Sequence, residues 1–168
     1  MAFTFLKAKG INIGTSIVDD EKLDFCKNLL ETYPNKLILP VDVAVTTKYA
    51  DEEPYKTKLV EEIENNEMGL DIGPKTIELF EKYLKDAKIV VWNGPMGVYE
   101  FETYQKGTKN LLTYMVDNKI KVLLGGGDIV AAAGVLGLKD KVYHASTGGG
   151  ASLEYLEGKE LPGLKALK

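Results

Sequence analysis

The sequence has a single cysteine, a single histidine and no arginine, so that all 21 strongly basic residues are lysines. One cysteine excludes an intrachain disulfide and agrees with a reducing compartment. The net charge is −4 and no dense lysine tract occurs, which argues against a basic patch for nucleic acid. No apolar run approaches the ~18 residues that a membrane helix requires, and the start shows no signal peptide. These absences predict a cytoplasmic protein without nucleic-acid or membrane partners.

Two nucleotide-binding fingerprints are also missing. The chain contains no G-x-x-x-x-G-K-[ST] motif, which excludes a P-loop, and no G-x-G-x-x-G after an expected strand, which excludes the usual dinucleotide loop. Because arginine is absent, no side chain of this protein can clamp a phosphate in a bidentate fashion. Any phosphate site must therefore be built in another way.

Apolar runs and helical patterns alternate along the 168 residues, a length that suits one domain with a sizeable core. This alternation predicts parallel βαβ units with right-handed crossovers. We therefore expect an α/β fold, with an open parallel sheet and helices on both faces: a Rossmann-like three-layer lobe that spans residues 1–168 as a single domain. Phe3, Phe5 and Leu6 form an abrupt apolar start, so we expect the sheet to be incomplete at its N-terminal edge.

The individual elements follow from local spacing and punctuation. Strands are predicted at 37–39, 41–45, 68–72, 88–92, 121–124 and 141–145. Helices are predicted at 20–33, 74–86, 104–117, 128–136 and 151–156. Asp19 or Asp20 is the expected N-cap of the first helix, and Pro74 is expected in a first turn. The acidic, weakly patterned stretch 51–66 is interpreted as a surface excursion.

Three of the expected strands run directly into glycine clusters. The clusters are residues 93–97, 125–128 and 146–150, and a potential helix follows each of them. Parallel strands end at a common edge of the sheet, where open α/β sheets bind ligands. Glycine lets backbone N–H groups approach an anion closely, and a helix N-terminus adds partial positive charge. Three such loops at one edge predict a ligand that carries phosphate.

Several residues in these loops allow two interpretations. Asp128, which follows three glycines, is a Mg²⁺ ligand beside phosphate or the N-cap of the next helix, and the two roles are compatible. Glu100 accepts hydrogen bonds from a ribose or is a solvated loop residue. The run Gly148, Gly149 and Gly150 exceeds what a turn needs and favours contact with an anion.

Four residues near the loops or on a helix are expected to be structural. His144 is a conceivable general base, but a buried, hydrogen-bonded strand position is favoured. Cys26 lies on an apolar helix face and is expected in the core. Trp92 and Tyr143 end apolar strands and are expected to pack against the interior.

Six stretches of the sequence carry a resemblance to a known family. Three of them are WNGPMGVYE at 92–100, GGGD at 125–128 and STGGGASLE at 146–154. The others are LPVD at 39–42, MGLDIGP at 68–74 and EGKELPG at 157–163. In this order and spacing the chain resembles phosphoglycerate kinase over essentially its whole length. The resemblance covers most of the C-terminal, nucleotide-binding lobe, which is less than half of the family's protein.

The resemblance implies reversible phosphoryl transfer between 1,3-bisphosphoglycerate and ADP in glycolysis, giving 3-phosphoglycerate and ATP, with Mg²⁺ bound through the nucleotide. It implies that Gly69 and Leu70 lie near the adenine and that Glu100 binds the ribose. It implies that Asp128 engages the Mg²⁺-nucleotide. The other nucleotide-binding residues that it implies are Asn93, Pro95, Gly97, Val98, Gly126, Gly127 and Ile129. The backbone N–H groups around the phosphoryl group in transfer would be those of Gly148, Gly149 and Gly150.

The chain departs from the family pattern in two respects. Ile129 stands where the family usually has Ser or Thr, which removes a hydroxyl able to bond a phosphate oxygen. The family's phosphate-contacting lysines would precede Met1, and its 3-phosphoglycerate site belongs to the N-terminal lobe. We therefore expect this chain to bind ADP or ATP but to turn over little alone, whereas the full-length family member is expected to be monomeric. The alternative is a non-catalytic folding or interaction fragment in which the glycine loops are relics.

Overall fold

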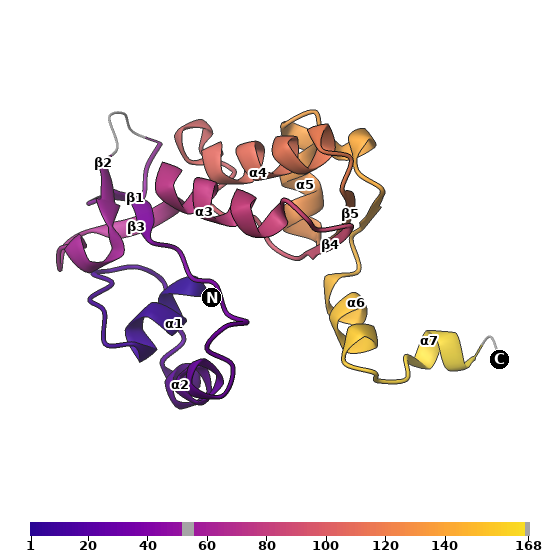
Figure 1. Ribbon diagram of the computed structural model, residues 1–168, viewed down its shortest axis with the longest axis horizontal. Helices are drawn as coiled ribbons and strands as arrows, with labels where there is room; N and C mark the ends of the chain where they lie inside the picture. Colours follow the sequence, from indigo (N-terminus) through magenta and orange to yellow (C-terminus); the bar gives the residue numbers. More distant parts are fainter. Residues whose placement is uncertain (52–55, 167–168) are drawn as a thin grey trace. The chain divides into compact units, whose positions relative to one another are not determined.

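The computed structural model describes residues 1–51 and 56–166 (Figure 1). Contacts divide the chain into two compact units, which are called unit 1 and unit 2 below. Unit 1 consists of Met1–Lys82 and Met96–Gly107, and unit 2 of Tyr83–Pro95 and Thr108–Lys168. That the whole chain folds as the single domain expected from its length stays a prediction.

Unit 1 contains an antiparallel sheet with the strand order β2-β1-β3. The central strand β1 (Asp42–Thr46) pairs with β2 (Lys56–Leu59) on one side and with β3 (Met68–Ile72) on the other. The first four residues of β1 are all buried, which suits its apolar, β-branched sequence. Parallel pairing, the expectation from alternation, is wrong for these strands. The chain between β1 and β3 forms β2 and the 3-10 turn η2 (Val60–Glu62) rather than a crossover helix.

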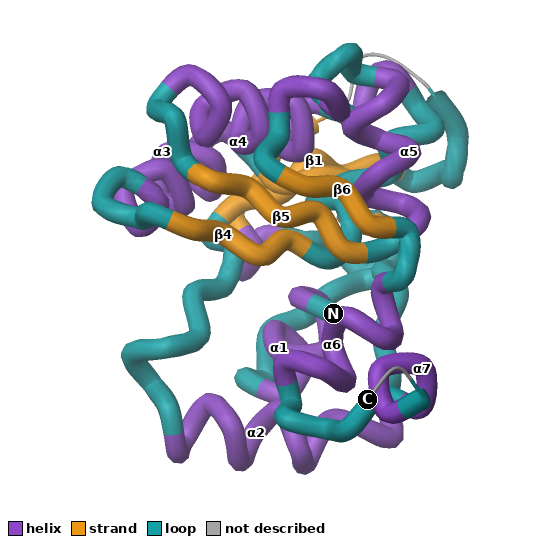
Figure 2. The backbone as a smooth tube through the Cα atoms, turned by 90° about the vertical axis from the view of Figure 1, so that its right-hand side faces the viewer, coloured by secondary structure: helices purple, strands orange, loops and turns teal. Residues whose placement is uncertain are grey.

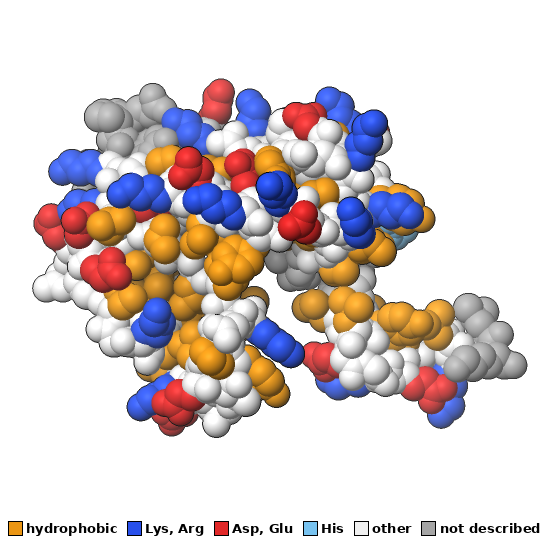
Figure 3. Space-filling model, viewed as in Figure 1, with side chains coloured by type: hydrophobic (Ala, Val, Ile, Leu, Met, Phe, Trp, Pro, Cys, Tyr) orange, Lys and Arg blue, Asp and Glu red, His pale blue; other side chains and the backbone are white. Residues whose placement is uncertain are grey.

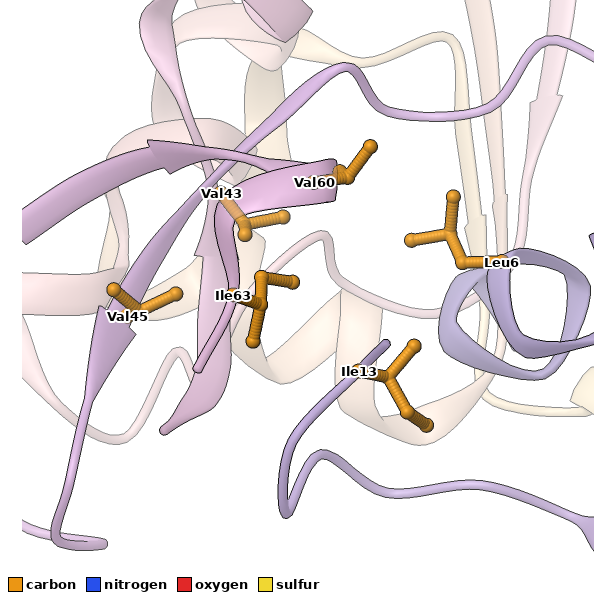
Figure 4. Close-up of a cluster of buried hydrophobic side chains, with 6 residues drawn as sticks. All are labelled: Leu6, Ile13, Val43, Val45, Val60 and Ile63. Carbon is orange, nitrogen blue, oxygen red and sulfur yellow. The ribbon is translucent and has the colours of Figure 1, made fainter. Parts of the chain in front are cut away.

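The main apolar core of unit 1 joins this sheet to helix α1 (Ala2–Ala8) (Figure 4). Its buried side chains are Leu6, Ile13, Val43, Val45, Val60 and Ile63. Most described residues of the stretch 51–66 are exposed, as expected of a surface excursion, but Val60 and Ile63 are buried in this core, so the interpretation is wrong for these two residues. A short strand and one 3-10 turn are too brief to show a hydrophobic period. Positions 52–55 lie outside the described residues.

At the starts of two helical segments of unit 1, an aspartate carboxylate accepts hydrogen bonds from backbone N–H groups. Asp19 accepts a hydrogen bond from the N–H of Glu21 in the 3-10 turn η1 (Asp20–Lys22), which leads into helix α2 (Leu23–Thr32). Helix α3 (Pro74–Leu84) begins at its proline as predicted. Its first turn is capped from a distance: the buried carboxylate of Asp42 accepts the N–H groups of Lys75 and Thr76 at 3.1 and 2.7 Å. Cys26 is buried on α2, as expected.

Unit 2 contains a parallel sheet with the strand order β4-β5-β6 (Figure 2). The strands are β4 (Ile89–Trp92), β5 (Lys121–Gly125) and β6 (His144–Ser146). Helices α4 (Lys106–Asp117) and α5 (Gly127–Val135) lie on one side of these strands, and α6 (Gly149–Leu156) on the other (Figure 2). The short helix α7 (Pro162–Lys165) follows. The expected α/β class, with a parallel sheet flanked by helices, is confirmed.

Several local expectations are wrong. Residues 37–39 form no strand. Pro40, which follows them, has no backbone N–H and cannot donate an inter-strand hydrogen bond, so β-sheet pairing begins only after it. Strand β6 is shorter than predicted, because Lys139–Lys141 forms the 3-10 turn η4. His144, expected to be buried, is exposed.

Of the two aromatic residues expected to pack, one does. Trp92 is buried and donates its ring N–H to the carbonyl of Gly94 at 2.6 Å. Tyr143 is 65% exposed, and the ammonium nitrogen of Lys121 lies 5.1 Å from its ring centroid. None of the described helices is both long and apolar enough to cross a membrane.

A buried ion pair fastens β2 to the turn before β3. The carboxylate of Glu67 is buried and accepts hydrogen bonds from Lys58 Nζ at 2.8 Å and from the N–H of Glu64 at 3.0 Å. Burial acts to raise the pKa of Glu67, but these hydrogen bonds outweigh it and hold the pKa below its usual value. The carboxylate is therefore ionised at neutral pH and depends on Lys58.

We expect Lys58→Met to lower the free energy of unfolding by about 3 kcal/mol, because it leaves a buried carboxylate without its cation. The matched control is Lys7→Met, which removes the exposed ion pair with Asp20 and should change stability by less than ~0.5 kcal/mol. Urea denaturation at pH 7 measures both. Equal losses in the two variants would contradict the interpretation.

Candidate functional site

The loops that follow the three parallel strands of unit 2 meet at one edge of the sheet. The side-chain amide of Asn93, directly after β4, donates a hydrogen bond to the carbonyl of Gly125 at the end of β5. The N–H of Gly126 donates to the carbonyl of Ser146 at the end of β6, at 2.8 Å. Each loop is thus bonded to its neighbour. This set of strand ends is called the loop junction below.

Two glycines of the loop junction are required by packing. A Cβ atom on Gly149 would lie 2.9 Å from the Cα of Gly126 and 3.3 Å from Asn93 Nδ2. Gly126 itself has a φ of +129°, a conformation that side-chain-bearing residues rarely adopt. These residues therefore let the second and third loops touch at the level of the backbone.

Gly127 and Gly150 differ from those two glycines. A Cβ atom on either would meet nothing within 4 Å, and neither has a positive φ. Packing within unit 2 therefore does not require glycine at these positions. The space beside the first turns of α5 and α6 is open.

Helices α5 and α6 both start at the loop junction without a side-chain cap. Their N-caps are Gly126 and Gly148, and neither helix has a side-chain capping hydrogen bond to the N–H groups of its first turn. Asp128 lies in the first turn of α5 and is exposed, so its interpretation as the N-cap is wrong. Uncapped first-turn N–H groups and the helix dipole together favour an anion at this edge.

Two serines that sequence reasoning did not single out shape the third loop. Ser152 donates its hydroxyl to the carbonyl of Gly148 at 2.7 Å, and Ser146 Oγ accepts the N–H of Gly148 at 3.2 Å. The only signal in the sequence is that Ser152 follows Gly148 by one helical turn. Ile129, the residue at the family's hydroxyl position, is completely buried. Its side chain belongs to the core of unit 2 rather than to the exposed edge.

Unit 1 holds a second group of predicted residues, around a cavity of about 290 Å³. Gly69, Leu70, Gly97 and Val98 all line it. The N–H of Val98 donates to the carbonyl of Leu70 at 2.8 Å, which fixes the segment after β4 against β3. Lining residues that sequence reasoning missed include Phe3, Ser16, Met68 and Met96.

The walls of this cavity are mostly apolar and tightly fitted. A Cβ atom on Gly69 would lie 2.2 Å from the ring of Phe3, so only glycine lets that ring lie against β3. The N–H of Gly69 donates to Ser16 Oγ at 2.9 Å. An apolar cavity with a few fixed polar groups suits a flat, largely apolar group of a small ligand.

Asp71, next to Leu70 on β3, is a buried carboxylate at this cavity. Its oxygens accept the N–H groups of Ile72 and Gly107, each at 2.8 Å. Burial raises the pKa of Asp71 to about 7, although these hydrogen bonds and the charge of Lys106 oppose the rise. Asp71 therefore changes its charge near neutral pH.

The remaining predicted residues lie outside both groups. Pro95 is half-buried and is not among the residues that line the cavity of unit 1. Glu100 is exposed on the segment after Val98. Within the described residues, no three acidic, histidine or cysteine side chains gather as a metal site. One exposed carboxylate, Asp128, fits a Mg²⁺ ion carried by phosphate oxygens rather than one held by the protein.

An α/β chain in which two neighbouring parallel strands, β5 and β6, lead into uncapped, glycine-rich helix starts has an arrangement that is typical of α/β proteins with phosphate-bearing ligands. The family model "Phosphoglycerate kinase" matches residues 1–159. The chain belongs to the phosphoglycerate kinase family.

Comparison with individual relatives shows how much of such a protein this chain represents. It is 52% identical to phosphoglycerate kinase of Fusobacterium nucleatum, over 99% of the chain and 42% of the relative. It is 54% identical to that of Lactobacillus delbrueckii, over 98% of the chain and 41% of the relative. A solved structure of phosphoglycerate kinase from Coxiella burnetii matches 99% of the chain and 44% of its own, with a TM-score of 0.92 and 39% identity. The chain thus spans about two fifths of its curated relatives' length.

The packing at the loop junction generates a prediction about adjacent glycines. We expect Gly149→Ala to destabilise unit 2 by about 1–2 kcal/mol, because the new methyl group meets the backbone of Gly126. Gly150→Ala introduces its methyl group into open space within the same helix turn and should be neutral or stabilising by up to ~1 kcal/mol. Thermal unfolding of both variants measures the difference. Loss of stability in Gly150→Ala as large as in Gly149→Ala would show that the contact is not responsible.

The pKa of Asp71 generates a second prediction. A carboxyl whose pKa is raised on folding stabilises the protein below its ordinary pKa of 3.8, and this stability is lost as the pH rises through about 7. Between pH 5 and pH 8 the contribution amounts to about 2–3 kcal/mol. Stability of the wild type should therefore fall over this range relative to Asp71→Asn, whose amide does not titrate. Parallel pH profiles of unfolding free energy in the two proteins would contradict the raised pKa.

Proposed function

We propose that this chain binds an adenine nucleotide with Mg²⁺ and forms the nucleotide-binding part of a phosphoglycerate kinase. The observation that carries the proposal is the loop junction, where Asn93, Gly126 and Gly149 touch while Gly127 and Gly150 open onto free space. Backbone N–H groups of uncapped helix starts are donors for phosphate oxygens, and glycine allows the close approach. Family membership supports ADP or ATP as the ligand.

The predicted residues take separate roles in this proposal. Gly69, Leu70, Gly97 and Val98 would hold the adenine in the apolar cavity of unit 1, and Glu100 would bind the ribose. Asn93 and Pro95 would contribute to the nucleotide pocket. In the first turn of α5, the backbone N–H groups of Gly127 and Ile129 would bind phosphate oxygens, and the carboxylate of Asp128 would engage the Mg²⁺ that those oxygens carry. Gly148, Gly149 and Gly150 would surround the phosphoryl group in transfer.

Mg²⁺, when bound through the nucleotide, would neutralise phosphate charge at Asp128. The protein's own contribution is to position the nucleotide: the N–H groups of α5 and α6 would orient the phosphate chain for in-line transfer of the phosphoryl group, either from the acyl phosphate to ADP or from ATP to the carboxylate of 3-phosphoglycerate. Lobe closure in the full-length protein would exclude water from the reaction.

The complete reaction needs more than this chain. The chain spans about two fifths of a relative's length and contains no arginine. In this proposal the 3-phosphoglycerate site therefore belongs to other parts of the family's protein. We therefore expect a coupled kinase assay on the chain alone to stay near background. A cytoplasmic location belongs to the same proposal.

A second proposal, a non-catalytic folding or interaction fragment, rests on exposed apolar side chains in unit 2. Ile89 and Val91 on β4 are 60% and 49% exposed. Leu153, Tyr155 and Leu156 of α6 are exposed as well, and Figure 3 shows apolar atoms gathered over this helix. Such surfaces favour association. Oligomers that form with or without nucleotide, measured by light scattering, would favour this proposal over nucleotide binding.

The nucleotide proposal is tested by calorimetry with ADP, with and without Mg²⁺. We expect Mg²⁺ to strengthen the binding of ADP. Asp128→Ala should raise the dissociation constant of ADP in the presence of Mg²⁺ about tenfold, because a charge-assisted contact is worth about 1.5 kcal/mol or more. Asp140→Ala, an exposed carboxylate in the η4 turn of unit 2, is the matched control and should bind as the wild type does. No heat and no change in melting temperature at millimolar nucleotide would exclude the proposal.

A further inference from the structure

The segment Met96–Gly107 of unit 1 is attached to β3 at both of its ends. Near the start, the N–H of Val98 donates to the carbonyl of Leu70 at 2.8 Å. At the finish, the N–H of Gly107 donates to the carboxylate of Asp71 at 2.8 Å. Leu70 and Asp71, which are consecutive residues of β3, therefore hold the two ends of this segment close together.

The carboxylate of Asp71 is wedged between the two ends of that loop. A Cβ atom on Gly97 would lie 2.5 Å from Asp71 Oδ1, and one on Gly107 would lie 2.3 Å from the same atom. Both positions are glycine because the carboxylate fills the space that a side chain would need. Asp71 is only 5% exposed, and its position determines where Gly97 can lie.

The position of Gly97 matters because Gly97 and Val98 line the apolar cavity together with Gly69 and Leu70 of β3. We propose that Asp71 is a positioning residue for the adenine end of the nucleotide: it holds the segment Met96–Gly107 against β3 and so sets the width of the cavity. This inference rests on the proposed function, because it assigns the cavity to an adenine ring.

The surroundings of Asp71 make this attachment sensitive to pH. Burial raises its pKa to about 7, and Lys106, at the start of α4, acts in the opposite direction. Other ionisable residues in this part of unit 1 are Asp42 on the neighbouring strand β1, and Tyr49 and the N-terminal Met1, which line the same cavity. Ionisation strengthens the hydrogen bond from Gly107, so the attachment of the segment Met96–Gly107 to β3 should tighten as the pH rises through about 7.

A merely structural role would be shared by Asp42. It is equally buried in the same sheet and also accepts backbone N–H groups at a helix start, those of Lys75 and Thr76. It does not line the cavity. Asp42→Asn is therefore the matched control: it should lower the melting temperature without changing ligand affinity.

The experiment uses the full chain as wild type, Asp71→Asn and Asp42→Asn. Amide NMR signals of Gly97 and Gly107 are followed from pH 5 to pH 8.5 without ligand, and dissociation constants are measured for adenosine and for Mg²⁺-ADP. We expect both signals to titrate together near pH 7 in the wild type and in Asp42→Asn, and not in Asp71→Asn. We expect Asp71→Asn to raise the dissociation constants of adenosine and of Mg²⁺-ADP by the same factor, about tenfold, because the substitution changes only the part of the site that would contact the base.

Each outcome decides the inference. Equal affinity in the wild type and Asp71→Asn, or equal weakening in Asp71→Asn and Asp42→Asn, would overturn it. If the wild type binds neither ligand, the proposed function fails, and the amide signals alone decide whether Asp71 holds the segment. If Asp71→Asn does not fold, the wild-type titration decides: a common midpoint for Gly97 and Gly107 supports the inference, and its absence overturns it.

Discussion

The candidate phosphate-binding edge depends on how three neighbouring strands satisfy their last backbone groups. A strand that ends beside its neighbours leaves polar groups that need partners. Here the side-chain amide of Asn93 donates a hydrogen bond to the carbonyl of Gly125, and the N–H of Gly126 donates one to the carbonyl of Ser146. These two bonds bring Gly126 and Gly149 into contact and direct the starts of α5 and α6 to one edge. The proposed anion affinity is a property of this arrangement rather than of any one side chain.

The parts that sequence reasoning predicted well are those encoded by contiguous residues. An apolar run followed by glycine and a helical pattern describes β5 and α5 without reference to the rest of the chain. The antiparallel pairing of β1 and β3, and the burial of Val60 and Ile63, depend on contacts between distant residues. His144 shows the same limit: it begins β6, an outer strand in the order β4-β5-β6, and this position in the sheet cannot be predicted from the local sequence. Asp71 was invisible for this reason: its partner Gly107 lies 36 residues away.

The glycines of this chain fall into groups that composition alone does not separate. Gly69, Gly97 and Gly107 are glycine because a neighbouring side chain occupies the space beside them, and Gly149 because another backbone does. Gly127, Gly134, Gly150 and Gly163 have neither a neighbour within 4 Å nor a positive φ. The first group is explained by the fold. Within the second group, the proposed function supplies a reason for Gly127 and Gly150, which lie in the first turns of α5 and α6, but none for Gly134 and Gly163.

The absence of arginine limits what such a site can do. Backbone N–H groups and helix dipoles carry partial charges, so they orient a phosphate chain more than they neutralise it. Phosphoryl transfer requires both, and its transition state spreads charge over oxygens that full cations must stabilise. On the proposed function, the backbone of this chain supplies orientation and Mg²⁺ supplies part of the neutralisation. The cations that complete the neutralisation are then lysines, since the chain has no arginine, or residues of the three fifths of a relative's length that the chain does not span. Orientation and neutralisation are therefore separate contributions, and on this proposal nucleotide binding can be retained where turnover is lost.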